Sequence, residues 1–376
     1  MNKISGFLLV IALIFAACSK DDSGTDNPGE QPDNNSFDRG AMLENWADNI
    51  IAPAFENFKS STQELELKTS AFVQDPSEAN LVELRAAFQS AYIDFQTVSM
   101  FEIGKADQLN YRNYLNTYPA NAANIKQKAE SGSYNLELPS SFAEQGFPAM
   151  DYLINGLGAN DTETLGFYTT NTNSTKYSAY LEDVAKRINS LTAEVNASWQ
   201  GEFRDSFVTN TSSSSTGSVD RFTNDYVMYF EKILRSGKIG YPAGAFTGEP
   251  SPENAEAFYS KNFSKTLYLK AVQSVQDFYN GKHFNSAQSG KSYKQYLEYL
   301  DSMKNGTDLS VLIDAQFNTI IDQAASLDAS LKSQVETNNT KMLEAFDELQ
   351  KEVVLLKVDM MQALSISVDY VDSDGD

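Results

Sequence analysis

The sequence predicts an all-α protein made of two helical bundles. Three observations lead to this fold class. Apolar residues recur at helical spacing along nearly the whole chain, the alternation typical of strands is almost absent, and a stretch rich in Pro and Gly divides the helical part in two. An apolar N-terminal stretch and a polar segment precede the helical part. We therefore expect a signal peptide, a disordered tether and then two helical-bundle domains.

The first 17 residues predict a signal peptide. Lys3 precedes an apolar core that runs from Phe7 to Phe15, which is short for a membrane-spanning helix. Cys18, the only cysteine of the chain, follows Phe-Ala-Ala, as at a bacterial lipoprotein cleavage site. We expect Cys18 to carry the lipid, with an ordinary signal peptide cleaved nearby as the alternative. A single cysteine also excludes an intramolecular disulfide.

Residues 18–36 predict a flexible linker behind the lipidated cysteine. From Ser19 to Ser36 there is no apolar side chain, and Asp, Asn, Pro and Gly are frequent. The run Lys20-Asp21-Asp22 resembles the signal that sends Bacteroidetes lipoproteins to the cell surface. We therefore expect an outer-membrane lipoprotein, on the cell surface or on the periplasmic face.

Helical periodicity covers the body of the chain from Phe37 onward. After "DPSEAN", where Pro76 and Ser77 favour a helix start, apolar residues step by three and four from Leu81 to Val98. The last long helix, 342–363, has the apolar seam of a bundle helix. Further helices are predicted at 39–74, 176–207, 218–236, 264–280, 293–303 and 309–327. Loops are predicted at 211–218, 240–254 and 280–292, and the alternating tail "SISVDYV" predicts a short extended segment.

The Pro- and Gly-rich loop sets the predicted domain border. It gives an N-terminal bundle at 37–248 and a C-terminal bundle at 249–376. One helix of each half has a similar pattern, "LRAAFQSAYIDF" in the first and "YLKAVQSVQDFY" in the second. The similarity favours an internal duplication only weakly, because amphipathic helices also resemble each other by chance.

Charge and missing motifs exclude several function classes. The formal net charge of −22 argues against a nucleic-acid partner, which needs a basic surface. An acidic surface suits cations, although it is more often only a solvated exterior. There is no HExxH, P-loop or GxGxxG motif, and His283 is the only histidine. The terminal "DSDGD" lacks the glutamate of a calcium loop. Zinc-dependent and triad-type hydrolysis are therefore not expected.

Three carboxylates are the remaining candidates for chemistry. Asp151 lies on the apolar stripe of "GFPAMDYLING", where a charge is costly unless it is paired or bound. Glu102 also lies near an apolar helical face, and Glu256 precedes "AFYSKNFS". Two such groups act as acid and base or hold a hard cation. The alternative is an ion pair with a basic residue such as Arg112 or Lys238.

Aromatic residues form the last notable group. Nineteen tyrosines and 23 phenylalanines are present, and Tyr111, Tyr114 and Tyr118 follow one another closely. Such a density lines a sugar or peptide groove, or fills a helical core. The core interpretation is the one we favour.

Several segments, in order, resemble the imelysin (M75 peptidase-like) family. "QGFPAMDYLINGL" is similar to its Gly-x-His-x-x-Glu segment and the helix that follows. "LRAAFQSAYIDFQTVSMFEIG", "YPANAANIKQ", "EKILRSGKIGYPAG", "EAFYSKNFSKTLYLKAVQSVQDFYNG" and "LLKVDMMQALSISVDYVDSDGD" resemble its other conserved pieces. The resemblance runs from Trp46 to Asp376. It implies two helical bundles related by a pseudo-twofold, a site between them, and a bacterial envelope protein linked to iron uptake.

The chain departs from the family motif at its centre. Gly146 is retained, but Pro148 replaces the histidine and Asp151 the glutamate. Proline offers no side-chain ligand, so a His/Glu metal pair is excluded. The resemblance therefore implies a ligand site rather than a peptidase site. We place it at these three residues with Glu102, Glu256 and Ser260.

Three hypotheses follow. The first is a ligand-binding lipoprotein that takes iron or haem from a source or an outer-membrane receptor. The second is an M75-type peptidase with an altered carboxylate site, and the third is a surface scaffold that binds a protein or glycan through aromatic patches. If basic residues close off Asp151, it is a structural plug. If it opens on a cleft beside Glu102 or Glu256, a cation or ligand site is expected.

Overall fold

A computed structural model describes residues 36–370, so that the predicted signal peptide, Cys18, nearly all of the linker and the terminal "DSDGD" lie outside the described residues. In this part of the chain the structure is almost entirely helical, as predicted. Residues 37–370 belong to a single compact unit. None of the helices between residues 36 and 370 is both long and apolar enough to cross a bilayer.

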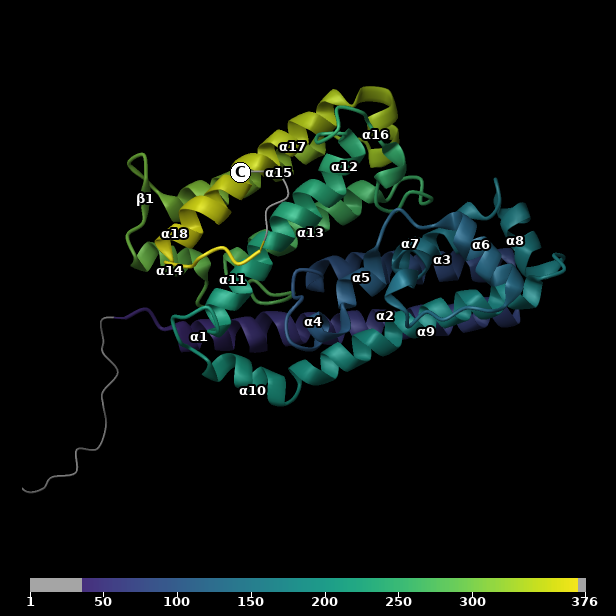
Figure 1. Ribbon diagram of the computed structural model, residues 1–376, viewed down its shortest axis with the longest axis horizontal. Coiled ribbons are helices and arrows are strands. Elements are labelled where there is room, and N and C mark those ends of the chain that lie inside the picture. The colour runs from purple at the N-terminus through teal and green to yellow at the C-terminus, as the bar shows by residue number, and fades with distance from the viewer. Residues whose placement is uncertain (1–35, 371–376) are drawn as a thin grey trace, which may run out of the picture. The chain divides into compact units, whose positions relative to one another are not determined.

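The first group of helices packs around α2, α3 and α9 (Figure 1). Its elements are α1 (Arg39–Glu44), η1 (Asn45–Ile51), α2 (Ala52–Gln74), α3 (Glu78–Val98), α4 (Lys105–Leu109), α5 (Tyr111–Asn116), α6 (Ala122–Ser131), η2 (Pro139–Glu144), α7 (Gly146–Asp151), η3 (Tyr152–Gly156), α8 (Asp161–Thr169), α9 (Ser174–Trp199) and α10 (Glu202–Thr209). The elements η1 and η3 are π-helical stretches within longer helices.

The second group packs around η4, α13, α15 and α17. Its elements are α11 (Ser218–Met228), η4 (Tyr229–Gly240), α12 (Tyr241–Ala243), η5 (Pro252–Asn254), α13 (Ser264–Tyr279), α14 (Tyr293–Tyr299), β1 (Met303–Lys304), β2 (Thr307–Asp308), α15 (Leu309–Ala325), α16 (Leu331–Asn338), α17 (Thr340–Val353), η6 (Val354–Met360) and α18 (Met361–Ala363). The two strands form a small antiparallel hairpin.

The two groups meet through α3 and α13, the helices with similar sequences. Aromatic rings fill the contact between the groups: Trp46 packs against Phe278 and Tyr293 with ring centroids 5.0 and 4.7 Å apart. Of the closely spaced tyrosines noted in the sequence, Tyr111 and Tyr114 are buried and belong to the core. The element η4 packs against α17. The predicted domain border after residue 248 places η4 in the N-terminal domain and α17 in the C-terminal domain. That border stays a prediction.

Several helix boundaries differ from the predicted ones. The helix expected at 176–207 is interrupted between α9 and α10, where Gln200 and Gly201 end the helical run. The helix expected at 293–303 ends at Tyr299, and Met303 begins β1 instead. The tail expected to be extended forms no strand between residues 365 and 370. Short elements depend on contacts that local periodicity does not record.

Candidate functional site

Asp151 is buried and fully hydrogen-bonded. Its carboxylate accepts bonds from Asn155 Nδ2 at 2.9 Å, Ser260 Oγ at 2.6 Å, and the backbone N–H groups of Tyr259 at 2.9 Å and Ser260 at 3.3 Å. Burial raises the pKa of Asp151, while these four hydrogen bonds lower it. The donors are neutral groups, not the basic side chains considered above. Asp151 therefore fastens α7 to the loop before α13.

Gly146 and Pro148 shape the start of α7. Gly146 has φ +71°, and a Cβ there would lie 2.3 Å from the carbonyl oxygen of Leu115. Pro148 lies in the first helical turn, where a backbone N–H has no intrahelical partner. Between them the Phe147 ring stacks on Tyr92, with centroids 4.5 Å apart. The retained glycine is thus explained by a close backbone contact.

Glu256 forms a buried ion pair with Lys238. The Lys238 Nζ lies 2.5 Å from Glu256 Oε2 and also donates to Gln96 Oε1 at 2.8 Å. Asn116 Nδ2 donates to Glu256 Oε1 at 2.7 Å. Burial lowers the pKa of Lys238, and the carboxylate of Glu256 opposes that shift. This network links α3, α5 and η4 to the loop before α13.

Glu102 lies apart from the other two carboxylates. Both of its oxygens accept the backbone N–H of Arg112 at 3.1 Å, near the start of α5. Burial raises the pKa of Glu102. In the part of the chain that the structure describes, no hydrogen bond or ion pair joins Glu102, Asp151 and Glu256, and no group of three or more His, Cys, Asp or Glu could hold a metal ion. Of the predicted site residues, the structure brings Asp151 and Ser260 into contact.

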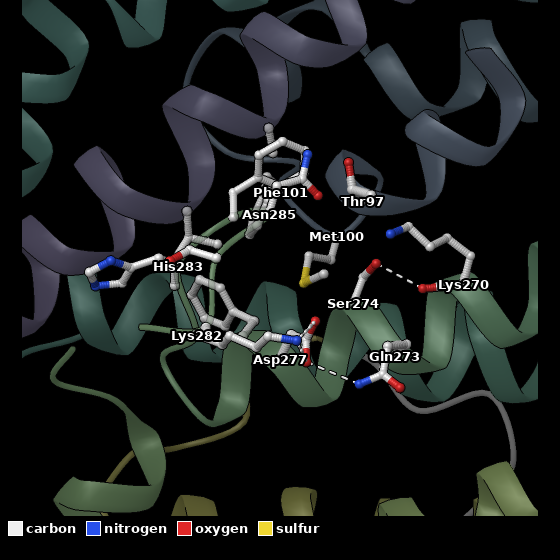
Figure 2. Close-up of a pocket in the computed structure, with 16 residues that line it drawn as sticks. Thr97, Met100, Phe101, Lys270, Gln273, Ser274, Asp277, Lys282, His283 and Asn285 are labelled. Atoms are coloured by element: carbon white, nitrogen blue, oxygen red, sulfur yellow. Dashed lines mark hydrogen bonds and ion pairs between the residues drawn. The ribbon is translucent and has the colours of Figure 1, made fainter. Parts of the chain in front are cut away.

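The cavity shown in Figure 2 lies between the two helix groups and measures about 530 Å³. We call it the interbundle cavity. The first group supplies Ile50, Ala54, Thr97, Met100 and Phe101. Helix α13 and the loop after it supply Lys270, Gln273, Ser274, Asp277, Phe278, Lys282, His283, Phe284, Asn285, Ser286 and Ala287. One wall is thus largely apolar and the other largely polar.

The polar wall leaves one ammonium group free. Asp277 accepts hydrogen bonds from Gln273 Nε2 at 3.0 Å and from Lys282 Nζ at 3.2 Å. Lys270 Nζ, in contrast, has no hydrogen bond or ion pair within residues 36–370, and Figure 2 shows it beside the same space as Met100. The imidazole of His283 points away from the Met100 sulfur in that view.

Sequence reasoning missed this cavity. Gln273 and Ser274 appear in the compared helices only as a sign of duplication, and His283 appears only as an isolated histidine. No local motif marks Met100 or Lys270, because the cavity arises where two helices far apart in sequence leave space between them.

Comparison with known proteins settles the family. The sequence model of imelysin (Peptidase_M75) matches residues 51–356, well over half of the chain. The chain belongs to the imelysin family. The search of curated proteins found no match to this chain.

Two solved structures share the imelysin fold of this chain. One is from Parabacteroides distasonis ATCC 8503 and is provisionally named an iron-regulated protein A precursor. It has a TM-score of 0.69 and 16% identity, and the match covers 86% of this chain and 95% of the other. The second, an imelysin-like protein from Psychrobacter arcticum 273-4, has a TM-score of 0.62 and 15% identity, covering 88% and 97%.

Proposed function

We propose that this member of the imelysin family is a non-catalytic outer-membrane lipoprotein that binds an iron-containing ligand, such as haem, in the interbundle cavity. The observation that carries the proposal is the cavity itself, with apolar residues on one wall and the free Lys270 ammonium on the other. A ligand with an apolar body and an acidic edge suits both walls. The name of the Parabacteroides relative, an iron-regulated protein, supports iron as the cargo.

The family's signature position supports binding rather than hydrolysis. Pro148 has no side chain that could bind a metal or move a proton. The Asp151 carboxylate is occupied by four hydrogen bonds and does not line the interbundle cavity. A peptidase would need Asp151 to reach a substrate. We therefore assign it a structural role.

The membrane anchor and the partner are further parts of the proposal. The lipobox-like end at Cys18 and the acidic run after it support export and lipidation. A lipid-anchored binding protein with a long tether would receive its cargo from a haem or iron source, or pass it to an outer-membrane receptor.

Haem titration tests the cargo. The full chain, purified in mild non-ionic detergent, is titrated with haem and followed by Soret absorbance, and with ferric citrate by calorimetry and metal analysis. We expect one of the two to bind with 1:1 stoichiometry. Reversing the charge at the cavity in Lys270→Glu should weaken binding about tenfold or more, because an acidic edge would then meet a carboxylate.

The control is Lys126→Glu, which makes the same charge change on an exposed position of α6. It should bind as the wild type does. If neither haem nor ferric citrate binds, the iron part of the proposal is refuted. If Lys270→Glu binds as tightly as the wild type, the binding site does not lie in the interbundle cavity.

A further inference from the structure

A second cavity, of about 210 Å³, lies between α3, α5 and η4. We call it the Arg112 pocket. Fourteen residues line it, among them Arg112, Tyr118, Tyr229, Lys232 and Lys238. Three of them are basic and none is acidic, in a chain whose formal net charge is −22. The side chains that line the pocket thus include no carboxylate that would repel an anion.

Arg112 has hydrogen-bonding capacity that the fold does not use. Its side chain is buried, with 7% of the residue surface exposed, and Nε donates to the backbone oxygen of Ser99 at 2.7 Å. Its guanidinium lies over the Tyr229 ring, 5.2 Å from the centroid. Nη2 is buried and has no hydrogen-bond partner. Within the described residues no ion pair of 4 Å or less joins the guanidinium to a carboxylate, although Glu102 and Asp225 are near enough for Arg112 to lower the pKa of each. A buried N–H donor without an acceptor is costly, so a ligand that accepts a hydrogen bond from Nη2 gains that energy.

The other two basic residues already have partners. Lys238 is paired with Glu256, and Lys232 lies 3.4 Å from a carboxylate oxygen of Glu231. The Tyr118 hydroxyl, by contrast, has no hydrogen bond between residues 36 and 370, although Tyr118 lines the pocket. Two residues that line the pocket, one of them charged, thus carry a donor without a protein acceptor.

We propose that the Arg112 pocket binds a small oxyanion, a carboxylate or a phosphate. Planar guanidinium groups match both chemistries with paired N–H donors. The Tyr118 hydroxyl adds a neutral donor. The pocket is lined by none of the residues of the interbundle cavity, so this site does not rest on the proposed function and stands or falls independently of it.

Calorimetry with two anions tests the site. The full chain, in detergent and a chloride buffer free of phosphate, is titrated separately with inorganic phosphate and with citrate, which distinguishes the two chemistries. We expect at least one to bind, and Arg112→Gln to weaken it about tenfold or more, since a charge-assisted hydrogen bond is lost.

The matched control is Arg187→Gln. Arg187 lies 4.8 Å over the Tyr114 ring and also has a nitrogen without a partner, yet it does not line the Arg112 pocket. It should bind the anion as the wild type does. The proposal is overturned if neither anion binds the wild type, if Arg112→Gln binds unchanged, or if Arg187→Gln is weakened equally. If circular dichroism shows that Arg112→Gln is unfolded, Tyr118→Phe is tested in its place. We expect this variant to bind the anion several-fold more weakly, and unchanged binding would contradict the site.

Discussion

Replacing Asp151 by alanine should destabilise the protein without touching a ligand site. The change removes the acceptor of four hydrogen bonds, three of which are 2.9 Å or shorter. Asn155 borders a surface cavity and the Ser260 hydroxyl can rotate, so both find other partners. The backbone N–H groups of Tyr259 and Ser260 cannot move with the same freedom.

The magnitude follows from those two backbone donors. Each buried donor left without an acceptor costs about 1–3 kcal/mol. Part of the total cost of the two donors is offset, because the alanine variant no longer has to bury a carboxylate. We expect Asp151→Ala to lose about 3 kcal/mol of unfolding free energy, and Asp151→Asn, which keeps one acceptor and the shape, to lose about 1 kcal/mol.

Equilibrium urea unfolding measures both values, read from the midpoint at an unchanged slope. Asp347→Ala is the control, because Asp347 is exposed on α17 and has no hydrogen bond or ion pair in the described part of the chain. It should change stability by less than about 0.5 kcal/mol. A loss below about 1 kcal/mol for Asp151→Ala would refute the structural role that we assign to this carboxylate.

Three further predictions concern the fold. Burial raises the pKa of Asp225 to about 7, so the folded state holds the proton of this carboxyl more tightly than the unfolded state does. Asp225→Asn should therefore stabilise the protein at pH 8 by about 1–2 kcal/mol. Urea unfolding should show this gain over wild type vanish as the pH falls from about 7 to the ordinary aspartate pKa of 3.8. Gly146→Ala should cost more than about 2 kcal/mol because its Cβ meets a backbone carbonyl, whereas Gly248→Ala, also at positive φ but in open space, should cost about 1 kcal/mol by thermal unfolding. Lys238→Met should cost about 3–5 kcal/mol by leaving Glu256 buried and unpaired, and the double variant with Glu256→Met should cost clearly less; additive losses in a double-mutant cycle would contradict the ion pair.

The sequence predicts the helices well because their information is local. Apolar spacing of three and four places α3, α13 and the continuous run of α17, η6 and α18 within a few residues of their observed bounds. The break after Trp199 and the β1–β2 hairpin were not predicted, because Gly201 and the turn before Thr307 act through packing and backbone conformation rather than through periodicity.

The candidate site was less accessible to sequence reasoning. That Asp151 lies on a buried face follows from its spacing, but its partners Tyr259 and Ser260 lie more than one hundred residues further along the chain. The free charge of Lys270 likewise becomes visible only when α13 is placed against α3. Long-range packing, not residue type, decides which polar groups are satisfied.

The central claim is that the cargo site is the interbundle cavity and that the family's signature position is structural in this chain. One measurement compares the two directly: the Kd for haem or ferric citrate, whichever binds, in Lys270→Glu and in Asp151→Asn. We predict a loss of about tenfold or more for Lys270→Glu and a change of less than about twofold for Asp151→Asn. A large loss in Asp151→Asn with unchanged binding in Lys270→Glu would contradict the account.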